Sequence, residues 1–201
     1  MLKYFHIIKF LMTHDLTKLK EFWEADIIID KSFKWRRLLR RLRERKREGL
    51  QNYFFWWRLA NEMFLNGNIS QHLTAKRIQI DLVSKYNIEI AFGARIGKNF
   101  IIGHYTGIVI TETTDIGDNV TIRQNTTIGR KTVFVEHDYR NRLCIKIGNN
   151  VDIGAHTCII GDNLSIGNNV KIGAMSFINK DIPDNCTVYT EKTNKIQIKS
   201  L

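Results

Sequence analysis

Isoleucine recurs every six residues through the second half of the chain. The series comprises Ile90, Ile96, Ile102 and Ile108, then, after a slip of two residues, Ile110, Ile116, Ile122 and Ile128, and it resumes at Ile147 after an interruption. An amphipathic helix would repeat at three or four residues and a half-buried strand would alternate, so neither produces this period. A hexapeptide repeat does, and it predicts a parallel β-solenoid in which each short face sends an aliphatic side chain inward.

Glycine and asparagine gather between the isoleucines, as in the run 148–150, because corners need backbone conformations that branched residues resist. We place the solenoid at residues 89–188 and a C-terminal tail at 189–201. Within the solenoid, residues 130–145 lack the six-residue period and are predicted to form a loop that projects from one corner. Long loops on rigid scaffolds often carry binding residues.

Residues 1–88 follow a helical pattern instead. Trp35, Leu38, Leu39 and Leu42 share one helical face in a stretch otherwise rich in arginine. An aromatic segment, YFFWW, follows at 53–57, and a further helical stretch over 70–86 leads into the solenoid. We therefore predict a helical N-terminal domain, 1–88, in front of a mainly β domain.

The net charge of +11 is concentrated in this helical part, where 18 Lys and Arg face 9 Asp and Glu. Ten of these basic residues lie between Lys31 and Arg47. One interpretation is a peripheral membrane contact through residues 31–58, because a basic amphipathic element suits anionic lipid. The alternatives are a helical domain that packs on the solenoid with its arginines in solvent, and nucleic-acid binding, which we do not expect.

The three cysteines, Cys144, Cys158 and Cys186, are odd in number and widely spaced, which favours reduced thiols over a disulfide framework. No apolar stretch approaches the roughly 18–20 residues of a membrane span. Lys3 and Lys9 interrupt the N-terminal apolar run, and no cleavage pattern follows it. We expect a cytoplasmic protein without a secretion signal.

One segment departs from the repeat in its chemistry, because IIGHYTGIVITE at 101–112 contains a histidine, His104, where other coils carry small or amide residues. The sequence HYTGIVITET at 104–113 resembles the signature H-[AYG]-T-G-I-V-[IV]-x-E-T of the hexapeptide-repeat acyltransferases, in their serine O-acetyltransferase-like branch. TIG at 127–129 and the later coils up to residue 188 fit the same family. The resemblance implies a left-handed parallel β-helix, a homotrimer, and acetyl-CoA bound in a groove between adjacent subunits.

The same resemblance makes His104 the general base. An alcohol is a poor nucleophile at neutral pH, and an imidazole with an unperturbed pKa of about 6.5 can accept its proton. The family's orienting carboxylate, fifteen residues earlier, corresponds to Glu89. Glu112 also matches the signature, and we expect it to support the local coil.

Donor binding is assigned by the resemblance to small residues of the C-terminal coils, where a ligand can approach the main chain closely. These residues are Gly154, Ala155, Gly173 and Ala174. Lys171 is a candidate partner for a CoA phosphate, and the amide after Gly129 is a candidate donor to the thioester oxygen. Turning a corner would also explain the glycines and alanines.

Two departures from the serine acetyltransferases concern the acceptor. Those enzymes carry an aspartate before the catalytic histidine, where this chain has Gly103, and a gap-free count does not find their Arg-His pair. The ionic groups of serine need charged partners, whereas a sugar hydroxyl needs only the base and a polar cleft. His137, Arg140 and Arg142 of the loop are candidate acceptor contacts. We predict an acetyl-CoA-dependent O-acetyltransferase of a surface-polysaccharide sugar or its precursor, with L-serine as the alternative acceptor.

Two other classes of function remain. Some β-helices bind zinc between subunits through histidines that include a pair five residues apart, but His104, His137 and His156 are separated by 33 and 19 residues, so we expect no metal. A purely structural trimer would bind no acetyl-CoA.

Overall fold

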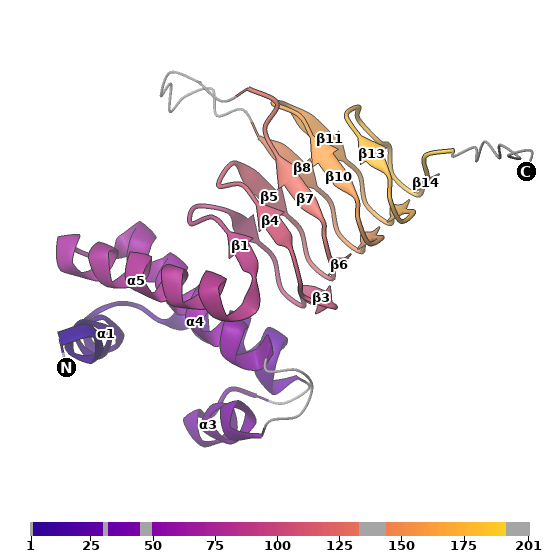
Figure 1. Cartoon of the computed structure of the whole chain (residues 1–201). Coiled ribbons are helices and arrows are strands. Elements are labelled where there is room, and N and C mark those ends of the chain that lie inside the picture. The colour runs from indigo at the N-terminus through magenta and orange to yellow at the C-terminus, as the bar shows by residue number, and fades with distance from the viewer. Residues whose placement is uncertain (1, 30–31, 45–49, 133–143, 192–201) are drawn as a thin grey trace, which may run out of the picture.

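The computed structural model describes residues 2–29, 32–44, 50–132 and 144–191. Helices come first and strands follow, as Figure 1 shows. The helices are α1 (Leu2–Thr13), α2 (Thr17–Trp23), the π-helical turn η1 (Glu24–Ile28), α3 (Trp35–Arg43), α4 (Leu50–Asn66) and α5 (Ile69–Tyr86). The strands are β1 (Ile88–Ile90), β2 (Arg95–Ile96), β3 (Ile101–Gly103), β4 (Ile108–Ile110), β5 (Thr114–Ile116), β6 (Thr121–Arg123), β7 (Thr127–Gly129), β8 (Ile145–Ile147), β9 (Asp152–Ile153), β10 (Cys158–Ile160), β11 (Leu164–Ile166), β12 (Lys171–Ile172), β13 (Phe177–Ile178) and β14 (Thr187–Val188). The predicted order of a helical region and a parallel β-solenoid is confirmed.

The strands stack into three parallel sheets, one on each face of the solenoid. We call β1-β4-β7-β10-β13 the first sheet, β11-β8-β5-β2 the second and β14-β12-β9-β6-β3 the third. Ile88 pairs with Ile108, and Ile110 with Ile128, so the isoleucines of successive coils stack on one another. In β1 the middle residue is exposed while both flanking isoleucines are buried, as the repeat predicts.

A column of asparagines lines the corner between the second and third sheets. Each has a left-handed backbone, with φ between 54° and 60°, which asparagine adopts more readily than most residues. The side-chain amide of each donates to the side-chain oxygen of the next at 2.9–3.1 Å. The column consists of Asn99, Asn119, Asn150, Asn169 and Asn185. At this corner of the solenoid, asparagine therefore occupies the left-handed position in every described coil.

The aromatic segment of α4 belongs largely to the core. Tyr53, Phe54 and Trp57 are buried, and the indole N–H of Trp57 donates to the carbonyl of Ile90 at 3.0 Å. These rings therefore hold the helices against the first coil. They are not available to a lipid surface, so the membrane interpretation of residues 31–58 loses most of its aromatic part.

A buried ion pair joins the helical region to the solenoid. Arg58 of α4 lies 2.9 Å from the carboxylate of Asp26, and both side chains are almost completely buried. The guanidinium also donates to the carbonyls of Ile96 and Gly97, each at 2.6 Å, and the amide of Asn99 donates to Asp26 at 2.9 Å. Burial raises the pKa of Asp26 and lowers the pKa of Arg58. The first coil is thus joined to the helices through the Arg58–Asp26 ion pair, and loss of either partner would leave a buried charge uncompensated.

Helix α3 carries much of the basic run. Its Leu38 is fully buried, whereas Trp35 and Leu39 remain 44% and 48% exposed. The predicted apolar face of this helix is therefore shared between the core and the solvent. Among the described helices, none combines the length and apolar character that a bilayer crossing requires.

Candidate active site

His104 lies at the corner that leads from β3 to β4, and this corner is longer than its counterpart in the next coil. The strand register aligns Gly103 with Arg123 and Ile110 with Ile128. Between these two aligned positions the first coil has six residues, 104–109, and the second coil has four, 124–127. These two additional residues account for the two-residue slip in the isoleucine series between Ile108 and Ile110. His104 has a left-handed backbone, with φ of 58°, and an exposed side chain.

A shallow depression of about 370 Å³ adjoins His104. Its other lining residues are Tyr105, Thr106 and Gln124. Among the described residues that line it, none is an acid, a lysine or an arginine. The depression therefore combines one imidazole with hydroxyl and amide groups.

The helical region contacts the corner that carries His104. The ring of Tyr105 meets the ring of Tyr86 edge-on, with centroids 6.1 Å apart, and Tyr86 packs in the same way on the buried Tyr53 at 5.5 Å. The amide of Gly107 donates to the carbonyl of Asn87, the C-cap residue of α5, at 2.9 Å. The corner that carries His104 is thus positioned by α5 as well as by the solenoid.

Gln124 is a residue of this site that sequence reasoning missed. It follows β6 as His104 follows β3, and these strands are paired in register. Its side-chain oxygen is buried and makes no hydrogen bond within the described part of the chain. Its place one coil away from His104 was readable from the repeat, but a lone glutamine between isoleucines gave no chemical signal.

Glu89 lies in the middle of β1 with its side chain exposed, and it pairs in register with Val109 of β4. Across the described residues, no hydrogen bond connects Glu89 with His104. The orienting role of Glu89 stays a prediction.

Glu112 does support the local coil. One carboxylate oxygen lies 3.0 Å from the guanidinium of Arg130, and the other accepts from the hydroxyl of Thr111 at 2.7 Å. Arg130 follows β7, where the predicted loop begins, so this pair ties two corners together.

Asp162 fixes the same end of the loop. It accepts from the amides of Lys131 at 3.1 Å and Thr132 at 2.9 Å, and from the Thr132 hydroxyl. The hydroxyl and amide of Thr132 hold the pKa of Asp162 below its usual value. The loop candidates His137, Arg140 and Arg142 lie outside the described residues.

Four of the six donor candidates share an edge of the solenoid with His104. Gly154 and Ala155 follow β9, and Gly173 and Ala174 follow β12, so all four lie between the third and first sheets. Lys171 points outward from β12 with an exposed side chain. Gly129 ends β7, at the opposite edge of the first sheet.

The two kinds of glycine differ in what packing demands of them. A Cβ on Gly154 would lie 2.4 Å from the amide nitrogen of Ala174, so the stacking of coils alone requires glycine there. A Cβ on Gly129 would meet nothing closer than Ile160 Cδ1, at an ordinary 3.7 Å, and its φ is not positive. Packing therefore explains Gly154 and leaves Gly129 without a structural reason.

Left-handed residues on the His104 edge differ from the asparagine column. They are His104, Asn125, His156 and Met175, and His156 Nε2 lies 3.3 Å from the side-chain amide of Asn125. The same backbone conformation selects asparagine throughout the other corner, so the side chains of His156 and Met175 are not explained by the turn. Sequence reasoning considered His156 only as a metal ligand, and among the described residues no group of histidine, cysteine or acid is arranged to hold a metal.

Known proteins resemble this chain both in sequence and in structure. No protein-family model matches the chain. The putative colanic acid biosynthesis acetyltransferase WcaB of Escherichia coli K12 is 40% identical over 114 residues, which cover 57% of this chain and 66% of WcaB. The chain therefore spans just under two thirds of that relative.

Solved serine acetyltransferases share the fold. Isoform 3 from Entamoeba histolytica, in complex with cysteine, superimposes with a TM-score of 0.69 at 26% identity, over 97% of this chain and 64% of that one. The enzyme from Brucella abortus, in complex with coenzyme A, gives a TM-score of 0.61 at 29% identity, over 71% of this chain and 53% of that one. Because the first comparison covers nearly the whole chain, it includes the helical region as well as the solenoid.

Proposed function

We propose that this chain is a serine acetyltransferase-like hexapeptide acyltransferase that transfers the acetyl group of acetyl-CoA to a sugar hydroxyl of a surface polysaccharide or its precursor. The observation that carries the proposal is the exposed His104 on a lengthened corner, beside a depression lined by neutral polar groups. Such a lining suits an uncharged polyhydroxyl acceptor.

In the proposed reaction His104 acts as general base. Its imidazole accepts the hydroxyl proton while the hydroxyl oxygen attacks the thioester carbonyl carbon. A carbon–oxygen bond replaces the carbon–sulfur bond, and the imidazolium returns the proton to the departing CoA thiolate. The backbone amide after Gly129 stabilises the negative charge that develops on the carbonyl oxygen. Glu89 orients the imidazole from β1.

The donor is proposed to lie along the edge of Gly154, Ala155, Gly173 and Ala174. The complex of the Brucella abortus enzyme with coenzyme A supports CoA as the carrier within the family. Lys171 is proposed to meet a CoA phosphate, and His156 and Met175 add an imidazole and a thioether to the edge of Gly154. Replacing His156 with asparagine should leave the fold intact and raise the KM for acetyl-CoA, since asparagine suits the turn.

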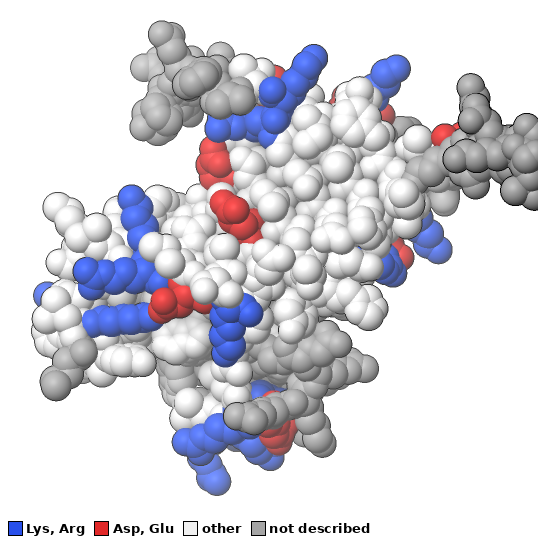
Figure 2. Space-filling model, viewed as in Figure 1, with Lys and Arg blue, Asp and Glu red and all other residues white. Residues whose placement is uncertain are grey.

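A homotrimer would complete the site. His104 and Gly129 lie at opposite edges of the first sheet, and this supports a site shared between neighbouring protomers. The outward residues of this sheet include Val109, Thr127, Cys158 and Phe177, with Glu89 as the charged exception, and Figure 2 shows the corresponding face largely free of charge. An uncharged flat face suits burial against another copy.

The sugar acceptor rests on two observations. The 40% identity to a putative colanic acid acetyltransferase favours a polysaccharide substrate. The described lining of the His104 depression offers no ionic partner for the carboxylate and ammonium of an amino acid. L-Serine is the second candidate, because the solved structures that cover most of this chain are serine acetyltransferases. Contacts from His137, Arg140 and Arg142 are proposed for either acceptor.

We place the protein at the cytoplasmic face of the membrane, in peripheral contact through residues 31–58. With Tyr53, Phe54 and Trp57 of α4 in the core, we propose that the contact falls on α3, where Trp35 and Leu39 are about half exposed beside the exposed Arg36 and Arg40. Flotation with vesicles containing anionic lipid tests this. The wild-type chain should float, whereas the Arg36→Glu, Arg40→Glu variant should stay in the lower fraction.

An acceptor screen tests the function. Purified protein is mixed with acetyl-CoA and single acceptors, namely free serine, simple sugars and oligosaccharides from surface polysaccharides, and released CoA thiol is measured. We expect turnover with a saccharide and not with serine. Turnover with serine alone would establish the second candidate, and no release with any acceptor would refute acetyl transfer to a hydroxyl.

A further inference from the structure

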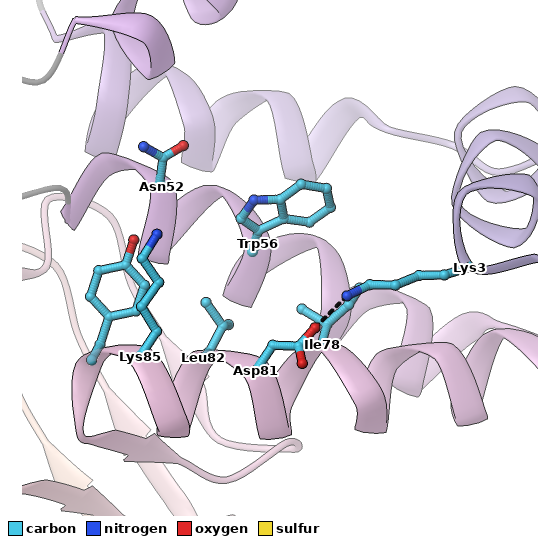
Figure 3. A pocket seen from close by; sticks show the side chains of 8 residues that line it. Lys3, Asn52, Trp56, Ile78, Asp81, Leu82 and Lys85 are labelled. Atoms are coloured by element: carbon cyan, nitrogen blue, oxygen red, sulfur yellow. Dashed lines mark hydrogen bonds and ion pairs between the residues drawn. The ribbon is translucent and has the colours of Figure 1, made fainter. Parts of the chain in front are cut away.

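A second pocket, of about 270 Å³, lies between α1, α4 and α5, and the proposed reaction does not use it (Figure 3). Its lining combines one large aromatic ring with amide, carboxylate and ammonium groups. The residues are Lys3 of α1, Asn52 and Trp56 of α4, and Ile78, Asp81, Leu82, Lys85 and Tyr86 of α5. The lining therefore offers a ligand both an aromatic face and groups that can hydrogen-bond or form an ion pair.

Trp56 is the first reason to expect a ligand. The indole N–H groups of Trp23 and Trp57 donate to the carbonyls of Phe55 and Ile90. The indole of Trp56 has no hydrogen-bond acceptor among the described residues, although an indole that is partly removed from water usually finds one. Figure 3 shows this ring above Ile78 and Leu82, so it presents both a flat apolar face and an unused donor.

The charges of the pocket are the second reason. Lys3 forms an ion pair with Asp81 across its rim. Lys85 has no carboxylate partner in the described chain, and its ammonium lies 5.0 Å from the centroid of the Tyr86 ring. One positive charge is therefore left for a ligand. The helical region as a whole reinforces this, with 18 basic against 9 acidic residues in 1–88.

The third reason is position. Tyr86 lines this pocket, and its ring contacts Tyr105, which lines the His104 depression. The two sites are therefore neighbours joined by a pair of aromatic rings. A chain of a few sugar units is the class of ligand that would reach from one to the other.

We propose that this pocket binds an acidic sugar unit of the acceptor polysaccharide and so holds the polymer while a neighbouring unit is acetylated. The Trp56 ring lies under the sugar and its N–H donates to a sugar oxygen. The carboxylate of the sugar pairs with Lys85, and Asn52 and Asp81 bind its hydroxyls. The inference rests on the proposed sugar acceptor.

Calorimetric titration without acetyl-CoA tests binding apart from catalysis. The full chain is titrated with a hexasaccharide that contains glucuronic acid and, separately, with a neutral glucose hexasaccharide. We expect the acidic ligand to bind more tightly. Lys85→Met should weaken its binding about tenfold or more, since a charge-assisted hydrogen bond is lost. Trp56→Phe, which keeps a ring and removes the donor, should weaken it by a smaller factor.

Lys76→Met is the matched control, because Lys76 is an exposed lysine on the same helix that does not line the pocket. Its affinity should equal that of the wild type. Wild-type affinity in both Lys85→Met and Trp56→Phe would overturn the proposal. The absence of binding to the acidic hexasaccharide by the wild-type chain would also overturn it. Full competition by inorganic phosphate at the ligand's own concentration would also overturn it, because the site would then recognise an anion and not a sugar.

A kinetic comparison separates this proposal from the proposed function. In Lys85→Met, kcat/KM should fall more for a polymeric acceptor than for a monosaccharide. If no saccharide is acetylated by the wild-type chain, the proposed function fails while the titration still decides the pocket. If polymer and monosaccharide are affected equally, the acetyltransferase stands and the holding site is refuted.

Discussion

Replacing Arg58 with methionine should destabilise the fold more than any exposed substitution in the helical region. The variant keeps much of the side-chain volume and removes the charge and all of its hydrogen bonds. The carboxylate of Asp26 then stays buried without its cation, and the carbonyls of Ile96 and Gly97 lose their donor. Breaking a buried pair by removing one partner costs about 3–5 kcal/mol.

Urea unfolding, followed by tryptophan fluorescence at a fixed protomer concentration, measures this loss. With a slope of about 1–3 kcal/mol per molar urea, the midpoint should fall by at least about 1 M. Arg36→Met is the control, because Arg36 is exposed on α3, and its effect should stay within about 0.5 kcal/mol.

A double-mutant cycle sharpens the interpretation. Asp26→Asn in the Arg58→Met background should cost less than the sum of the two single changes, because the second substitution removes a carboxylate that is already unpaired. Burial raises the pKa of Asp26, so its protonation should lessen the defect of Arg58→Met as the pH falls. A loss below about 1 kcal/mol for Arg58→Met, or simple additivity in the cycle, would show that the ion pair is not what joins the helices to the first coil.

Three further results follow from the geometry. Gly154→Ala should lower the melting temperature, because the added Cβ would lie 2.4 Å from the backbone of the next coil. Gly129→Ala, whose Cβ would have its nearest contact at 3.7 Å, should keep the melting temperature of the wild type and lose turnover. Equal losses of melting temperature in the two variants would contradict this. The fold lowers the pKa of Asp162, so the ionised carboxylate stabilises the protein above the ordinary pKa of about 3.8, and this stabilisation is lost as the pH falls through the lowered pKa. The melting temperature of the wild type should therefore decline over this acid range, and Asp162→Asn should decline less. Parallel curves for the two proteins would contradict this. Glu89→Gln should lower kcat with little change in the KM for acetyl-CoA, and wild-type kcat would remove Glu89 from the mechanism.

Much of the solenoid could be predicted because a six-residue period leaves few alternatives. The isoleucines stack as expected, and the asparagine corners follow from the left-handed backbone that they adopt. The slip after Ile108 was also visible in the sequence. Its meaning required the strand register, which shows that two added residues lengthen the corner of His104.

The helical region was harder to predict because its contacts are long-range. Nothing local distinguishes Arg58 from the arginines of α3, yet it is buried beside a carboxylate that lies 32 residues earlier. The aromatic segment at 53–57 was one part of the membrane interpretation, but its Tyr53, Phe54 and Trp57 are buried. The pocket of Trp56 draws its residues from three helices, so no single stretch of sequence announces it.

The rate of CoA release in the presence of a saccharide acceptor, compared between the wild-type chain and His104→Ala, tests the central claim most directly. Loss of a general base should lower kcat by about 10²–10⁴-fold. The melting temperature and oligomeric state should not change, because the side chain of His104 is exposed. Near-normal turnover by a correctly folded His104→Ala would contradict the account.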